Sequence, residues 1–62
     1  MKKHYEVSFK WAKDIYCTNI AHAESAEAVE EHYAKYSEVS VKEAKEYAIE
    51  DAQRKNMPII EI

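Results

Sequence analysis

Alternation of apolar and polar residues near the start of the chain gives the clearest structural signal. In residues 4–11, the side chains of Tyr5, Val7, Phe9 and Trp11 fall on one face, and polar side chains fall on the other. This period of two predicts a half-buried strand. Residues 15–22 have the β-branched and aromatic content of a second strand, and the short segment between them predicts an antiparallel hairpin.

The hairpin register stays open at this point. A loop of three residues places Phe9 opposite Cys17 and His4 opposite His22, whereas a loop of four places Phe9 opposite Thr18. A shift by one residue moves the whole second strand to the other face of the sheet. Neither register gives the second strand a fully apolar face, so both are retained.

Helical spacing begins after residue 24. Ser25 is a good N-cap residue, and Ala26, Val29, Tyr33 and Tyr36 recur on one face, which predicts a helix over residues 26–36. Residues 38–44 are ambiguous, because they fit either a strand or the capped start of a helix. We expect a short third strand, since a two-stranded hairpin needs a neighbour to form a stable sheet.

A second helix is predicted over residues 45–55, with Tyr47, Ala48 and Ala52 facing inward. Asn56 can occupy the left-handed position after the helix, and Pro58 prevents the helix from continuing. Residues 59–62 then fit a fourth strand. The predicted fold is α+β, with one small single-layer sheet, the order β-β-α-β-α-β and both helices packed on one face.

The length of 62 residues leaves room for one domain, spanning residues 1–62, with one core. A domain of this size buries a small fraction of its surface, so we expect self-association to a homodimer as a further source of stability. The single cysteine cannot form an intramolecular disulfide, and no apolar run resembles a signal peptide or a membrane span. A cytoplasmic location without membrane contact is the expectation.

Charge is distributed unevenly along the chain. Residues 1–13 carry four lysines against one glutamate, for a net charge of +3, whereas residues 14–34 carry five acidic and no basic residues. The whole chain has a net charge of −3. Proteins that bind nucleic acid usually carry a basic excess on one face, so this balance argues against a nucleic-acid partner.

The sequence contains no glycine. Phosphate-binding loops, the dinucleotide-binding fingerprint and the hydrolase nucleophile elbow all need glycine, because their backbone adopts positive φ or closely approaches the ligand. Their standard forms are therefore excluded. Where the fold needs a left-handed residue, Asn, Asp or Lys must supply it.

Thiol or metal chemistry would depend on Cys17 together with His4, His22 and His32. No paired spacing typical of a zinc site is present, and a buried free cysteine commonly acts as a small apolar residue. A His4–His22 cross-strand pair would offer two metal ligands, which make a weak site. We therefore predict no catalytic residue, no cofactor and no metal.

Two groups of residues are candidates for binding a partner. Four glutamates form an acidic ridge around the first helix, which Asp14 and Glu38 would extend: Glu24, Glu27, Glu30 and Glu31. A solvated face is the usual interpretation of such a ridge, a protein-binding face the second, and acid–base catalysis the weakest. Lys10 and Tyr16 form the second group, on the exposed side of the hairpin.

The expected function is a non-catalytic protein-interaction module that acts through the acidic helix face and the aromatic hairpin. By analogy of size and element order alone, it would be a small accessory or inhibitor protein of bacterial or phage origin. The alternatives are a nucleic-acid-binding regulator that uses the basic N-terminal strand, and a small metal- or thiol-dependent enzyme.

Overall fold

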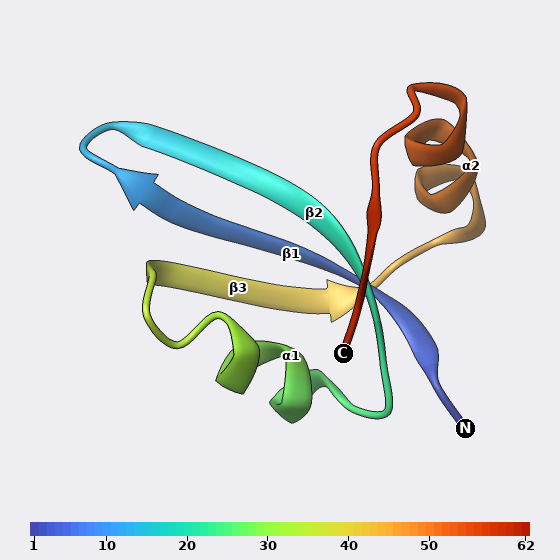
Figure 1. The fold of residues 1–62 in the computed structure, drawn as a ribbon, viewed down its shortest axis with the longest axis horizontal. Coiled ribbons are helices and arrows are strands. Elements are labelled where there is room, and N and C mark those ends of the chain that lie inside the picture. Colours follow the sequence, from blue (N-terminus) through green and yellow to red (C-terminus); the bar gives the residue numbers. More distant parts are fainter.

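The chain folds into one four-stranded sheet and two helices, in the predicted order (Figure 1). The computed structural model describes residues 1–62. Its elements are β1 (Lys3–Ala12), β2 (Ile15–Ala23), α1 (Ala26–His32), β3 (Ser37–Glu43), α2 (Glu46–Arg54) and β4 (Ile59–Glu61). The α+β class and the β-β-α-β-α-β order are confirmed, as is the choice of a strand rather than a helix after α1.

The strands lie in the order β3-β1-β2-β4. β1 is antiparallel to both β2 and β3, while β4 is parallel to β2 and pairs only with its last residues, from Ile20 to His22. β3 therefore forms one complete edge of the sheet. At the other edge, β4 leaves residues 15–19 of β2 without a neighbouring strand.

From His4 to Lys10 the hairpin adopts the register predicted for a three-residue loop, but the predicted loop length is wrong, because Ala12 pairs with Ile15 and only Lys13 and Asp14 connect the strands. Phe9 lies opposite Cys17, and His4 lies opposite His22. An irregularity between Lys10 and Ala12 shifts the pairing near the turn. Asp14 takes the left-handed conformation there, with φ of 59°, so an aspartate supplies the position that glycine often occupies.

α1 begins where the sequence predicts and ends earlier. The hydroxyl of Ser25 accepts a hydrogen bond from the backbone N–H of Ala28 at 3.1 Å, so Ser25 is the N-cap. The predicted extension of the helix to residue 36 is wrong. The chain must turn after His32 because Ser37 pairs with Lys10 of β1, and β3 starts at that point.

α2 ends in the predicted way. Asn56 adopts φ of 57°, and the backbone N–H of Met57 donates to the carbonyl of Ala52 at 2.9 Å. Together with a bond from Asn56 to Gln53, this is the Schellman arrangement that satisfies the last helical carbonyls. The inward position predicted for Tyr47 is wrong, since 73% of this residue is exposed.

The hydrophobic core lies between α1 and one face of the sheet. Val29 of α1 has no exposed surface, and the ring of Tyr33 packs on Phe9 with ring centres 4.9 Å apart. The core residues on this face are Tyr5, Val7, Phe9, Ala21, Ala23, Val29 and Tyr33. Nine of the 62 residues are buried, so the core is small, as the length predicts.

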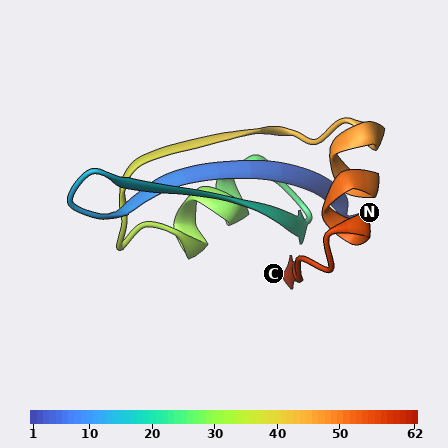
Figure 2. The same ribbon diagram turned by 90° about the horizontal axis from the view of Figure 1, so that it is seen from above.

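The two helices do not share a face, which corrects the predicted arrangement. Alternation along the strands places Glu6 and Ile20 on the face opposite the core cluster, and these residues line a groove together with Ala48 and Ala52 of α2. Figure 2 shows α1 beside the strands and α2 at the end of the sheet near both termini. On this face α2 packs over Ile20, which is 5% exposed.

No helix in the structure has the length and apolar character needed to cross a membrane.

Candidate functional site

The end of the β1–β2 hairpin exposes large apolar side chains. Trp11 is 54% exposed, Ile15 45% and Tyr16 60%. Figure 1 shows that the hairpin extends beyond α1 and β3 at this end. The alternation in β1 predicts Trp11 on the buried face, and this is wrong because no element reaches far enough to cover it.

Lys10 and Tyr16, both predicted as candidate partner-binding residues, lie together here as cross-strand neighbours. The Nζ atom of Lys10 is 5.8 Å from the centre of the Tyr16 ring. Glu38 joins them from β3: its carboxylate accepts a hydrogen bond from the Tyr16 hydroxyl at 3.2 Å and lies 3.5 Å from Nζ of Lys10. We call Lys10, Trp11, Ile15, Tyr16 and Glu38 the hairpin surface.

Glu38 was not expected at this place. Its predicted membership of the acidic ridge is wrong, because its carboxylate points to the hairpin. Its backbone is left-handed, with φ of 53°, which is unfavourable for a residue with a side chain. Glutamate rarely adopts this conformation, so the sequence does not predict that Glu38 contacts the hairpin.

The four glutamates of the acidic ridge are all exposed. Glu27, Glu30 and Glu31 lie on α1, and Glu24 precedes its N-cap. None of the ion pairs in the structure involves them, so their charge is not compensated within the chain. The structure joins the ridge to the hairpin surface by no hydrogen bond or ion pair.

The basic N-terminal segment, in contrast, is largely paired. Lys2 lies 3.9 Å from a carboxylate oxygen of Glu61, and Lys3 lies 3.9 Å from one of Glu43. Lys10 pairs with Glu38, as described above. Three of the four lysines at the start of the chain thus lie beside carboxylates from β3 and β4, and Lys13 forms no ion pair.

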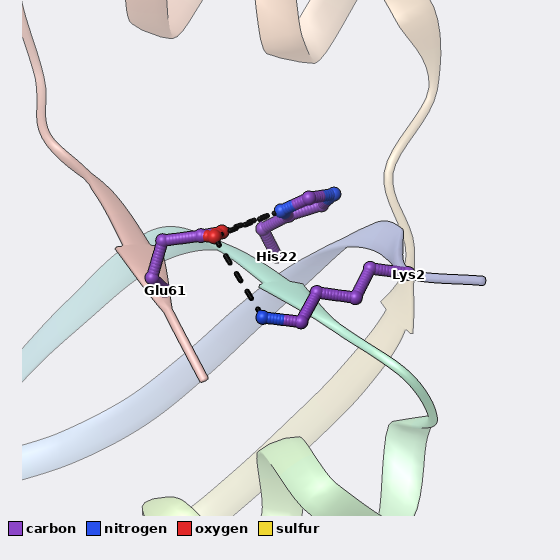
Figure 3. A network of polar contacts seen from close by, with 3 residues as sticks. All are labelled: Lys2, His22 and Glu61. Atoms are coloured by element: carbon purple, nitrogen blue, oxygen red, sulfur yellow. Dashed lines mark hydrogen bonds and ion pairs between the residues drawn. The ribbon is translucent and has the colours of Figure 1, made fainter.

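The His4–His22 pair forms in the observed register, and its rings stack with centres 4.6 Å apart. Nδ1 of His22 donates to the carboxylate of Glu61 at 2.5 Å, and Lys2 approaches the same carboxylate (Figure 3). The hydrogen bond from His22 is the main cause of the lowered pKa of Glu61. This network ties the short strand β4 to β2.

Cys17 lies on the other face of the sheet, against the hydrophobic core. The register places the His4–His22 pair on the opposite face, so neither histidine faces the thiol. Nowhere in the structure do three or more His, Cys, Asp or Glu side chains gather in a way that could hold a metal ion.

A groove of about 450 Å³ lies between α2 and the exposed face of the sheet. Its charged residues include Asp51, which pairs with Arg54 at 3.3 Å and with Lys55 at 3.0 Å. Because both cations are bound by the same carboxylate, the groove presents no converging set of free polar groups. It has no feature that indicates a particular ligand.

In comparisons with protein-family models, with curated proteins and with solved structures, nothing matches this chain. The functional argument therefore depends on its own residues.

Proposed function

We propose that this chain is a non-catalytic protein-interaction module that binds another protein through the hairpin surface. The observation that carries the proposal is that Trp11, Ile15 and Tyr16 at the hairpin end are each about half exposed, with the consecutive residues Ile15 and Tyr16 on opposite faces of the hairpin. Trp and Tyr are enriched among the residues that dominate binding energy at protein interfaces. Exposed apolar patches on small proteins commonly mark such interfaces.

The hairpin surface is also held in place before any partner binds. Tyr16 sits on a strand, and its hydroxyl and ring are held by Glu38 and Lys10. Association costs less free energy when contact residues lose little freedom on binding. This arrangement supports a binding role better than a role for Tyr16 in filling the core, since the ring lies outside the core.

The acidic ridge supplies the electrostatic part of the proposal. Its four uncompensated glutamates favour a partner with a basic surface, and their field accelerates the encounter at low ionic strength. An accessory or inhibitor protein that acts on a basic partner fits this distribution of charge. Association should therefore slow as salt is added.

The two alternative functions have less support. A nucleic-acid-binding strand would need free lysines, and Lys2, Lys3 and Lys10 each lie beside a carboxylate. An enzyme based on the thiol would need a base near Cys17, and neither His4 nor His22 faces it.

Affinity capture with matched variants tests the proposal. The tagged chain and the W11A/Y16A double variant are used as baits in a lysate of the cells that encode the protein, and bound proteins are quantified by mass spectrometry. Tyr47→Ala serves as the control, because Tyr47 is also an exposed aromatic residue but lies on α2. A partner held by the wild type and by Y47A but lost from W11A/Y16A supports the proposal. Equal capture by all three baits contradicts it.

A further inference from the structure

The outer edge of β3 is the longest stretch of unpaired backbone in the sheet. The strand spans seven residues, and β1 pairs with one side of it only. We propose that a second copy of this chain pairs with this edge, antiparallel to it and centred on Ser40. This edge shares Glu38 with the hairpin surface, but the inference does not depend on the function proposed above.

Backbone groups on β3 are available for such pairing. The N–H of Ala44 donates to the carbonyl of His4 at 2.9 Å, which fixes the residues whose backbone faces β1. By the alternation of an antiparallel ladder, Lys42 and Ser40 also face β1, whereas Val41 and Glu43 direct their N–H and C=O groups outward. In the register centred on Ser40, Val41 of each copy exchanges backbone hydrogen bonds with Val39 of the other.

The sequence of β3 is complementary to itself in this register. Residues 40–43 pair regularly with β1, whereas the pairing shifts between Ser40 and Ser37, where Glu38 has a left-handed backbone. When Ser40 faces Ser40 of the second copy, the regular overlap is therefore centred on residues 39–41, with Val39 opposite Val41. Glu38 and Lys42 approach each other at the two ends of this overlap, and each pair occurs twice. Cross-strand pairs of opposite charge and pairs of β-branched residues both stabilise a sheet.

Charges on β1 extend this complementarity. Within one copy, Nζ of Lys42 lies 3.6 Å from a carboxylate oxygen of Glu6, and Lys10 lies 3.5 Å from Glu38. Across the joined edges, the order becomes Glu6, Lys42, then Glu38 and Lys10 of the second copy. Opposite charges therefore alternate over four neighbouring strands on one face.

The same residues disfavour other registers. Charged side chains on an edge strand normally prevent edge-to-edge pairing. A shift by one residue in one direction would bring Glu38 opposite Glu43, and like charges directly opposite destabilise a sheet. A shift by one residue in the other direction, or by two residues in either direction, forms no like-charged pair but separates Glu38 from Lys42. The charges on β3 therefore favour the register centred on Ser40.

The other edge of the sheet is less suited to a second copy. β4 pairs with Ile20 to His22, and Thr18 and Asn19 line the groove together with Met57, so only residues 15–17 of β2 are left open on this edge. A small core gives a further reason for pairing, because a chain with nine buried residues gains stability from any partner that binds the folded form.

Sedimentation analysis of charge variants tests the proposal. The wild type is expected to form a dimer whose population rises over the micromolar range. Lys42→Glu places a glutamate opposite Glu38 of the second copy, and Glu38→Lys places a lysine opposite Lys42. Each variant alone should dimerise roughly tenfold more weakly or worse, because two attractive pairs become repulsive.

An equimolar mixture of K42E and E38K distinguishes the proposed register from a general loss of stability. In the mixed dimer both pairs between the two β3 strands are again of opposite charge, so the mixture should form heterodimers that neither variant forms with itself. Native mass spectrometry detects them directly. A wild type that stays monomeric, variants that dimerise as well as the wild type, or a mixture without heterodimers would each overturn the proposal.

A backbone variant covers the case in which a charge variant does not fold. N-methylation of Val41, introduced by chemical synthesis, removes an outward donor and leaves the pairing with β1 intact. It should abolish the dimer with an unchanged circular dichroism spectrum. Because Lys42 is outside the hairpin surface, K42E should lose the dimer and keep its captured partner, so the two proposals can fail separately.

Discussion

Glu38 offers a quantitative test of how this chain manages without glycine. Replacing it by Gly or by Ala removes the same carboxylate contacts with Lys10 and Tyr16, so the difference between the two variants reports the backbone alone. A left-handed conformation costs a residue with a side chain roughly 1–2 kcal/mol. The greater freedom of glycine in the unfolded chain offsets about 0.5–1 kcal/mol of this. Glu38→Gly should therefore be more stable than Glu38→Ala by about 1 kcal/mol.

Comparison with the wild type then separates the contribution of the side chain. The carboxylate contacts are exposed, and such contacts contribute about 0–1 kcal/mol. E38G should thus match or exceed the wild type in stability, while E38A should fall below it.

Thermal and urea unfolding followed by far-ultraviolet circular dichroism measures these differences. In a domain of this length, 1 kcal/mol corresponds to a shift in Tm of about 4–8 °C. If E38A proves as stable as E38G, the left-handed backbone at Glu38 carries no cost and the reasoning is refuted. If E38G is more stable than E38A, as expected, its affinity for the partner gives a second result. A variant E38G that is more stable than the wild type but binds the partner less tightly would indicate that Glu38 is retained for its contacts on the hairpin.

Three further predictions concern other parts of the fold. Asn56→Gly should raise the free energy of unfolding by about 0.5–1 kcal/mol in urea titrations, since position 56 is left-handed; no gain would contradict the cap geometry. Ser25→Ala should lower it by about 1 kcal/mol, because the cap to Ala28 is lost, whereas Ser25→Asp, which keeps an acceptor, should retain most of it. The pKa of Glu61 is lowered below its ordinary value of 4.5, mainly by the hydrogen bond from His22, so its contribution to stability is complete above that value and lost as the pH falls through the lowered pKa. Glu61→Gln should therefore show a shallower loss of stability on acidification, and an unchanged acid profile would show that this contact does not stabilise the fold.

Much of the fold could be predicted because its signals are local. The alternation around Val7 and Phe9 located β1, and the side chains of Ser25 and Asn56 marked a helix start and a helix end through hydrogen bonds and φ values that belong to single residues. The end of α1 could not be predicted in this way. The apolar spacing continues to Tyr36, and the helix stops earlier because Ser37 pairs with a strand far away in the sequence.

The face on which α2 packs depends on tertiary contacts. Its periodicity shows that the helix has an apolar side, but both faces of the sheet carry apolar residues. Ile20 on one face and Phe9 on the other each need a cover. Tyr33, the residue that follows α1, packs on Phe9, whereas Ile20 lies beside Ala48 and Ala52 of α2. The sequence pattern alone does not predict on which face of the sheet α2 packs.

In the candidate site, too, some features follow from local sequence and others depend on tertiary contacts. Lys10 and Tyr16 could be identified because cross-strand neighbours follow from the hairpin register. The exposure of Trp11 could not, since it depends on how far the other elements extend along the hairpin. Glu38 joins the site through a left-handed turn at a residue type that rarely adopts one.

Site-specific photo-crosslinking in cells tests the central claim, that the hairpin surface binds another protein, most directly. A photoreactive phenylalanine analogue is placed at Tyr16 in one sample and at Tyr47 in the other, because both side chains are exposed and lie on different elements. The account predicts a discrete crosslinked product of higher mass at position 16, absent at position 47 and reduced by Trp11→Ala. Two results would contradict it: equal crosslinking at positions 16 and 47, or no crosslinked product at position 16.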